Sequence, residues 1–172
     1  MQLHPIDKDS FSEVSIGDEF EFIPFDVSMV EEISKLVFKS VDGTADQDIW
    51  PSIYISIPKI EEFLYKFLEG SFGKHEPFYS WVLRENEQNI GACFLMTNEE
   101  TGFLMHIVID PEHKKRGYGT TLLSHSLRSL FRVNSSITKV ELAVTITNPA
   151  KLLYESLGFK ILNDASTFVW KR

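Results

Sequence analysis

The sequence predicts a single mixed α/β domain, in which a mostly antiparallel sheet of six to seven strands is flanked by about four helices. Its 172 residues are enough for one domain with a sizeable core, and 43% of them are hydrophobic. Short apolar runs of strand length alternate with longer segments of helical periodicity. No repeat or long linker divides the chain, so we expect one domain over residues 1–172.

The first part of the chain is expected to hold a strand and a helix. Residues 1–17 are polar, and we interpret them as an irregular N-terminal extension. Acidic and aromatic residues alternate over 19–25, a pattern typical of a half-buried strand. Apolar residues recur at helical spacing over 27–41, where Ser28 is a candidate N-cap.

A loop, a second helix and a hairpin are expected next. Residues 42–56 are rich in Gly, Pro and Asp, which favours a loop at first. Pro58 then opens a helix over 58–68. The apolar runs 79–84 and 89–97 flank a polar stretch and predict a β-hairpin.

The second half alternates strands and helices. Strands over 102–109 and 139–145 enclose an amphipathic helix over 117–132. A short helix follows, with Asn148 as a candidate N-cap and Gly158 as a left-handed stop. Closing strands are expected over 159–162 and 167–170.

Charge is distributed unevenly along the chain. Residues 1–100 hold seven basic and twenty acidic side chains, a charge of −13, whereas residues 101–172 hold ten and five, a charge of +5. This division favours an anionic cofactor on one side and a cationic substrate on the other, although uneven surface charge alone would look the same. No extended basic face is visible, so nucleic acid is not an expected partner.

The single cysteine, Cys93, excludes an internal disulfide and is compatible with the cytoplasm. Because it lies in the apolar run A-C-F-L-M, we interpret it as a small buried hydrophobe. The N-terminus lacks the basic and apolar regions of a signal peptide, and no apolar run reaches the roughly 20 residues of a membrane span. We therefore expect a cytoplasmic protein without a membrane partner.

The most informative segment is I-V-I-D-P-E-H-K-K-R-G-Y-G-T, at residues 107–120. It passes from an apolar strand through a turn to two glycines that open an amphipathic helix. N–H groups at a helix N-terminus carry roughly half a positive charge and bind anions. Gly117 and Gly119 have no Cβ, so a ligand can approach the main chain closely. Full positive charge is added by Lys114, Lys115 and Arg116. The segment predicts a phosphate or pyrophosphate site.

Two common glycine-loop motifs do not fit this segment. The P-loop pattern G-x-x-x-x-G-K-[ST] is absent from the chain. A dinucleotide fingerprint needs a third glycine where this chain has Leu122, and an acid at the end of the following strand, which Glu141 instead opens.

Together with N-P-A-K-L-L-Y-E-S-L-G-F at 148–159, the loop resembles the GCN5-related N-acetyltransferase (GNAT) family. The family's acetyl-CoA loop, Gln/Arg-x-x-Gly-x-Gly/Ala, maps onto Lys114 to Gly119, with Lys114 departing from the usual Gln or Arg. The downstream family pattern is matched by Asn148, Tyr154, Gly158 and Phe159. The resemblance covers about residues 89–170 and implies a GNAT-like fold with splayed strands at the cofactor site.

The resemblance implies an acetyl-CoA-dependent N-acetyltransferase that needs no metal and acts by direct attack in a ternary complex. Backbone groups of the strand before the loop would bond the pantetheine arm, and one N–H would polarise the thioester carbonyl. Loop N–H groups would hold the pyrophosphate, and Asn148 would approach the pantetheine, cap its helix, or do both. The implied cofactor-binding residues are Ile107, Val108, Ile109, Lys114, Lys115, Arg116, Gly117, Tyr118, Gly119, Thr120 and Asn148.

Tyr154 matches the family's general acid, because a phenol with a pKa of about 10 stays protonated at neutral pH and can donate to a leaving thiolate. Its alternative role is aromatic packing. Where some family members carry a basic Glu or His, this chain has Phe103 and Met105. The adjacent His106 could be re-aimed by a bulge. A water chain or a carboxylate of the acidic half would serve equally as the base.

The acidic half, which includes Asp42, Asp46 and Asp48, favours a cationic acceptor such as a polyamine, an aminoglycoside or a Lys side chain of a protein or peptide. A competing hypothesis is a non-catalytic acyl-CoA-binding sensor or partner module. The missing strand base favours that hypothesis, whereas Tyr154 and the intact loop oppose it. An exposed strand edge leaves a homodimer open.

Overall fold

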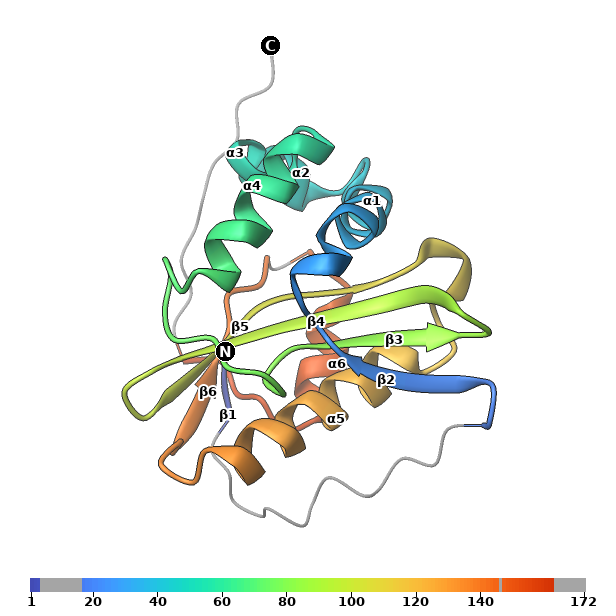
Figure 1. Cartoon of the computed structure of the whole chain (residues 1–172). Helices are drawn as coiled ribbons and strands as arrows, with labels where there is room; N and C mark the ends of the chain where they lie inside the picture. The colour runs from blue at the N-terminus through green and yellow to red at the C-terminus, as the bar shows by residue number, and fades with distance from the viewer. Residues whose placement is uncertain (4–16, 146, 163–172) are drawn as a thin grey trace.

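A computed structural model describes residues 1–3, 17–145 and 147–162, which form a central sheet between two helical layers (Figure 1). Six strands are joined in the order β1-β6-β5-β4-β3-β2, and only the β5–β6 pair is parallel. The predicted fold class and the mostly antiparallel sheet are therefore confirmed. The strands are β1 (Gln2–Leu3), β2 (Phe20–Pro24), β3 (Trp81–Glu85), β4 (Gln88–Asn98), β5 (Thr101–Ile109) and β6 (Lys139–Glu141).

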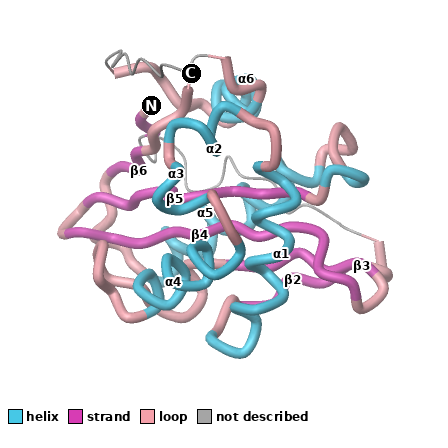
Figure 2. The backbone as a smooth tube through the Cα atoms, turned by 90° about the horizontal axis from the view of Figure 1, so that it is seen from above, coloured by secondary structure: helices cyan, strands magenta, loops and turns pink. Residues whose placement is uncertain are grey.

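The helices cover both faces of the sheet. One layer contains α1 (Val30–Val41), α2 (Ala45–Ile49), α3 (Pro51–Tyr54) and α4 (Ile57–Leu68). Figure 2 looks down on this layer. The opposite face is covered by α5 (Tyr118–Val133) and α6 (Ala150–Ser156).

The predicted hairpin forms between β3 and β4 around a two-residue turn. Asn86 and Glu87 have φ angles of 46° and 69°. Positive φ at both central positions is the mark of a type I′ turn, whose twist matches that of antiparallel strands. The turn sets a register in which Glu85 lies opposite Gln88.

Strand β4 is buried on both faces because it lies inside the sheet with helices above and below. Cys93 and Leu95 belong to the core on the α5 side, whereas Phe94 and Met96 belong to the core on the α1–α4 side. Successive side chains of a strand point to opposite faces, so one apolar run supplies both cores.

The segment 42–56 contains two short helices where the sequence favoured a loop. They raise the number of α-helices from about four to six within the described residues. Pro51 is the first residue of α3, a position where its missing N–H costs nothing. Helices of five and four residues are too short to show a helical period, so only packing reveals them.

The start of the first helical segment also differs from expectation. The Asp26 side chain accepts a hydrogen bond from the Ser28 N–H at 2.8 Å and caps a 3-10 turn over Val27–Met29, from which α1 continues. Asp26 therefore supplies the cap that was expected of Ser28.

At the chain ends, Gln2 and Leu3 pair with β6 although residues 1–17 were expected to be irregular. The strand expected over 139–145 ends at Glu141, and the one expected over 159–162 is reduced to a bridge between Lys160 and Gln2. The strand expected over 167–170 and most of the N-terminal segment lie outside the described residues. None of the described helices is long and apolar enough to cross a membrane.

Leu127 tests the packing of α5 on the sheet, since its side chain is fully buried there. We expect Leu127→Ala to lower the free energy of unfolding by about 2–5 kcal/mol, because it removes buried methyl groups and leaves a cavity. Urea denaturation followed by circular dichroism measures the change. Leu152→Ala on α6, at a side chain that is 72% exposed, is the control and should stay within about 0.5 kcal/mol of the parent protein. Equal losses in both variants would contradict this packing.

Candidate active site

The loop between β5 and α5 has the local structure of an anion site. Asp110 accepts a hydrogen bond from the Glu112 N–H at 2.9 Å and begins a 3-10 turn over Pro111–His113. Lys115 and Gly117 then have φ angles of 64° and 86°. These two left-handed positions turn the main chain into the N-terminus of α5.

The first N–H groups of α5 have no carbonyl partner within the helix. The intrahelical ladder starts with the Thr121 N–H, which donates to the Gly117 carbonyl at 3.1 Å. Gly117 is the N-cap, and a Cβ added there would meet no atom within 4 Å. The main chain at Gly117 is therefore open for the close approach that the sequence predicts.

Gly119 lacks a side chain for a different reason. A Cβ at this position would lie 2.8 Å from Cδ1 of Leu153 and 3.7 Å from Cγ1 of Ile109. The space that a side chain would fill is thus occupied by α6. The interpretation of Gly119 as a point of ligand approach is corrected to one of helix packing, while its N–H stays a candidate donor.

The cations of the loop differ in their surroundings. The Lys114 ammonium donates to the Ser40 carbonyl at 3.4 Å, near the C-terminal end of α1, where positive charge is favourable. Lys115 and Arg116 are exposed. Tyr118 packs on Phe20, with ring centroids 5.1 Å apart. Lys114 therefore anchors the loop to α1, and Lys115 and Arg116 are left to add charge near the helix N-terminus.

A second contact with α1 holds the start of the loop. The Lys39 ammonium lies 3.1 Å from carboxylate oxygens of both Asp110 and Glu112. Nε2 of His113 lies 3.0 Å from a Glu85 carboxylate oxygen, and the His113 side chain is only 13% exposed. The loop is thereby attached to both α1 and β3.

Strands β5 and β6 separate after a short paired stretch, as the family resemblance implied. Their pairing runs from Thr101 to Phe103, opposite Lys139 to Glu141, and stops there. Within the part of the chain that the structure describes, Ile107, Val108 and Ile109 pair with β4 on one side only. Their backbone groups on the β6 side form an open edge beside the candidate anion-binding loop over 110–117, called the anion loop.

A β-bulge in β5 re-aims His106. Phe94 lies opposite His106, but the next residue of β4, Leu95, lies opposite Leu104, so Met105 is an extra residue in β5. Leu104 faces the α5 side, and strict alternation would send His106 to the same side. Instead its ring lies beside Tyr54 of α3, on the α1–α4 side.

His106 and Tyr54 are in direct contact. The Tyr54 hydroxyl lies 3.2 Å from Nδ1 of His106, and the rings are stacked with centroids 5.2 Å apart. Burial lowers the pKa of the His106 imidazole to about 4, so the ring is neutral at ordinary working pH. Nε2 of the same ring is buried and has no hydrogen-bond partner among the described residues.

Tyr154 lies on α6, buried, with its ring packed edge-on against Phe159. Burial, and the nearby Cys93, Asp46 and Tyr54, raise the pKa of its phenol, so the hydroxyl keeps its proton. Burial also raises the pKa of the Cys93 thiol to about 12. Cys93 is therefore the inert, buried residue that was predicted.

Asn148 links the start of α6 to α2. Its side-chain oxygen accepts a hydrogen bond from the Ala150 N–H at 2.9 Å, which is the capping role predicted for it. Its side-chain amide donates to the Asp46 carboxylate at 3.0 Å. Burial raises the pKa of Asp46 above the ordinary range of an Asp. One carboxylate of the acidic half thus reaches the same neighbourhood as Tyr54 and Tyr154.

Tyr54 is the site residue that sequence reasoning missed. It lies in a segment expected to be a loop, and no motif marks it. Its only local signal is Pro51, which predicts a helix start three residues earlier. Among the described residues, no cluster of three or more His, Cys, Asp or Glu side chains could hold a metal ion.

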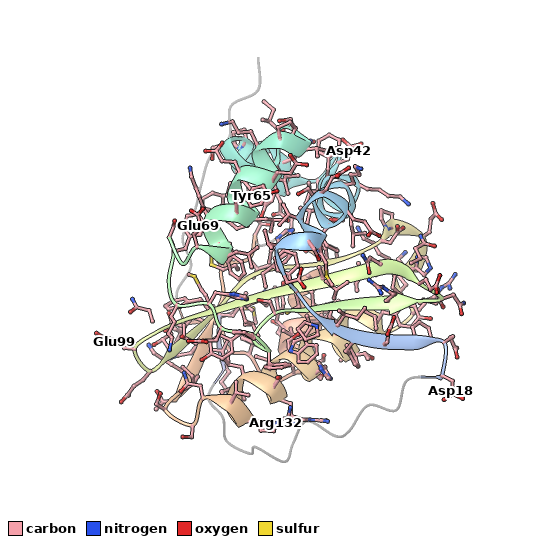
Figure 3. The ribbon with its side chains drawn as sticks, in the orientation of Figure 1. Asp18, Asp42, Tyr65, Glu69, Glu99 and Arg132 are labelled. Atoms are coloured by element: carbon pink, nitrogen blue, oxygen red, sulfur yellow. The ribbon has the colours of Figure 1, made fainter. Side chains whose placement is uncertain are left out.

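Surface charge follows the division seen in the sequence. Figure 3 shows Asp42 and Glu69 at the outside of the α1–α4 layer and Arg132 on the α5 side of the sheet. The acidic half of the chain thus supplies the helical layer on the His106 side, and the anion loop belongs to the basic half.

Comparison with known protein families identifies this architecture. A sequence model described as the acetyltransferase (GNAT) family matches residues 45–159. The chain belongs to the acetyltransferase (GNAT) family. Its activity is that of an acetyl-CoA-dependent N-acetyltransferase, as the loop and the Asn148–Phe159 segment predicted.

Solved GNAT-type structures share the fold at low sequence identity. The ribosomal-protein-S18-alanine N-acetyltransferase of Escherichia coli is 18% identical with a TM-score of 0.64, over 84% of this chain and 79% of that one. The yncA protein of Salmonella typhimurium, solved with acetyl-CoA, is 18% identical with a TM-score of 0.64, over 85% and 82%. The aminoglycoside N-acetyltransferase AAC(6')-Iy, solved with CoA, is 16% identical with a TM-score of 0.62, over 93% and 99%. No curated protein sequence matches the chain.

Proposed function

We propose that this GNAT protein transfers the acetyl group of acetyl-CoA to a primary amine by direct attack within a ternary complex. The observation that carries the proposal is the meeting of three features at one end of the sheet. These are the anion loop at the α5 N-terminus, the open edge of β5, and the buried Tyr154 hydroxyl. The loop would bind a pyrophosphate, the open strand edge would hydrogen-bond an extended amide-containing arm, and the Tyr154 hydroxyl would donate a proton.

The donor substrate is proposed to bind mainly through backbone groups. The open edge at Ile107, Val108 and Ile109 matches the amide hydrogen bonding of a pantetheine arm. The free N–H groups of the loop and of the first turn of α5 match a pyrophosphate. Asn148, whose side chain already bonds Ala150 and Asp46, would meet the arm at the start of α6. The loop residues in this role are Lys114, Lys115, Arg116, Gly117, Tyr118, Gly119 and Thr120.

Tyr154 is proposed to be the general acid. The acceptor nitrogen attacks the thioester carbonyl carbon, the C–S bond breaks, and the departing sulfur takes the phenolic proton. Because its raised pKa keeps the phenol protonated, this donor is available throughout the ordinary pH range. His106 is proposed as the second catalytic residue of the site.

The acceptor is proposed to be a cationic small molecule or a Lys side chain. Asp46 supports this proposal, because its carboxylate lies near both Tyr54 and Tyr154. Its hydrogen-bond donor, the Asn148 amide, carries no charge, so a carboxylate at this position would attract a cationic acceptor. The structural neighbours act on an aminoglycoside and on a protein alanine, so their names leave both classes of acceptor open.

An acetyl-CoA thiol-release screen tests the function. The panel contains polyamines, aminoglycosides, amino acids and Lys peptides, with neutral and anionic amines as controls. We expect thiol release with at least one cationic amine and slower turnover with anionic ones. Tight CoA binding by calorimetry without thiol release for any amine would instead indicate the non-catalytic acyl-CoA-binding module.

Gly117→Ala tests the loop as the pyrophosphate site, with Gly43→Ala as the matched control. Both glycines have positive φ, 86° and 69°, and neither Cβ would meet another atom within 4 Å. Each variant should therefore lose a similar stability, about 1–2 kcal/mol, from backbone strain alone. Only Gly117→Ala should also weaken CoA binding, by about tenfold or more in calorimetry. Equal CoA affinity of the two variants would contradict the site.

Tyr154→Phe tests the acid role, with Tyr79→Phe as the control. Tyr79 is also buried, and its hydroxyl accepts a hydrogen bond from the Asn134 side-chain amide at 3.1 Å, away from the candidate site. We expect Tyr154→Phe to lower kcat by about 100-fold or more while leaving the acetyl-CoA KM little changed, because a proton donor is lost. The control should keep full activity. An unchanged kcat of Tyr154→Phe across the pH range would refute the role.

A further inference from the structure

The contact between Tyr54 and His106 has a consequence for the reaction. Among the described residues, the Tyr54 hydroxyl has one hydrogen-bond partner, Nδ1 of His106 at 3.2 Å, and Nε2 of the same histidine has none. The Tyr54 side chain is buried, and burial and Asp46 raise the pKa of its phenol, so the hydroxyl carries its proton. A neutral phenol and a neutral imidazole therefore share one hydrogen bond.

The direction of that bond sets which imidazole nitrogen carries the proton. If Nδ1–H donates to the phenol oxygen, two buried groups stay without partners, the phenol O–H and the Nε2 lone pair. If the phenol O–H donates to Nδ1, only one group stays without a partner, the Nε2–H. Because each buried polar group without a partner is costly, the second arrangement is favoured. His106 then presents a buried N–H donor at Nε2.

We propose that this Nε2–H of His106 donates a hydrogen bond to the oxyanion formed during acetyl transfer, and that Tyr54 is the positioning residue that holds His106 in this tautomer. The proposal rests on the acetyltransferase function proposed above. When the amine nitrogen bonds to the carbonyl carbon, the C=O π pair moves onto oxygen, and Nε2–H stabilises that charge without giving up its proton. When the pair returns, the C–S bond breaks and the sulfur takes the proton of Tyr154.

This role fits the site better than that of a general base. A base works best when its pKa lies near the working pH, and the imidazole of His106 is held far below that. A neutral N–H donor that is already in position does not have to reorient when negative charge develops on the carbonyl oxygen. The acceptor's proton then leaves by one of the other routes that the sequence left open, a water chain or a carboxylate such as Asp46.

Two substitutions of His106 separate a donor from a base. His106→Gln keeps an N–H group near the position of Nε2 but cannot act as a base, whereas His106→Leu keeps neither property. We expect His106→Leu to lower kcat by about 100-fold to 1,000-fold, the usual effect of losing one oxyanion donor. His106→Gln should stay within about tenfold of the parent enzyme. Equal losses in the two variants would overturn the donor role.

Tyr54→Phe tests the positioning role, again with Tyr79→Phe as the matched loss of one buried hydroxyl. We expect Tyr54→Phe to lower kcat by about tenfold and to leave the acetyl-CoA KM unchanged, as for one lost hydrogen bond. Tyr79→Phe should change neither. A Tyr54→Phe enzyme with the kcat of the control would contradict the proposal.

Nitrogen-15 NMR of the unliganded protein reads the tautomer without any enzyme activity. The chain has five histidines, and the His106 signals are assigned by their loss in His106→Gln. We expect a neutral ring protonated at Nε2 in the parent protein and a shift towards the Nδ1–H form in Tyr54→Phe. A ring protonated at Nδ1, or a charged ring at pH 7, would overturn the proposal even if the thiol-release screen succeeds. If the screen fails and the NMR result holds, the proposed function is wrong and the Tyr54–His106 geometry stands.

Discussion

At Met105, strand β5 has one residue more than strand β4 opposite it, and the arrangement of the site depends on this bulge. Before the bulge, β5 pairs with both of its neighbours. Beyond it, β5 pairs with β4 alone among the described strands, so its other edge is open there. The same extra residue reverses the alternation of side chains and brings His106 to the side of Tyr54. A single irregularity thus coincides with the open edge and sets the orientation of a candidate catalytic residue.

Three side chains of the candidate site are uncharged. Burial lowers the pKa of His106 and raises those of Tyr54 and Tyr154, so all three side chains are neutral at ordinary pH. Such an environment strengthens hydrogen bonds to a developing negative charge, because little solvent screens them. Chemistry at this site therefore depends on where N–H and O–H groups are held, more than on charged catalysts.

The helical layer of α1 to α4 contributes to the site in two ways. The C-terminal part of α1 holds the anion loop through Lys39 and Lys114, so these side chains position backbone groups of the loop. The short helix α2 brings Asp46 into contact with Asn148, just before α6. The short helix α3 brings Tyr54 into contact with His106 of β5. Residues from the acidic half of the chain thereby complete a site whose motifs all lie in the basic half.

Much of the fold and of the donor site follows from local sequence signals. Periodicity and turn residues were enough to predict the long helices, the hairpin between residues 79–84 and 89–97, and most of the succession of strands and helices along the chain, because these depend on neighbours within about ten residues. The loop from Lys114 to Gly119 and the segment from Asn148 to Phe159 were enough to predict the family and its cosubstrate, acetyl-CoA. The sequence could not show why position 119 requires a glycine, because Leu153, whose side chain fills the space of a Cβ there, is 34 positions away along the chain.

By itself, then, the sequence determined the family, the position of the anion loop and the identity of Tyr154 as the candidate acid. Only the tertiary structure decided the orientation of His106, its partner Tyr54, the anchoring of Lys114 on α1 and the contact of Asp46 with Asn148. The physical reason is that each of these depends on contacts between distant segments. A bulge, a helix of four residues and a hydrogen bond between residues 46 and 148 leave no periodic trace in the sequence.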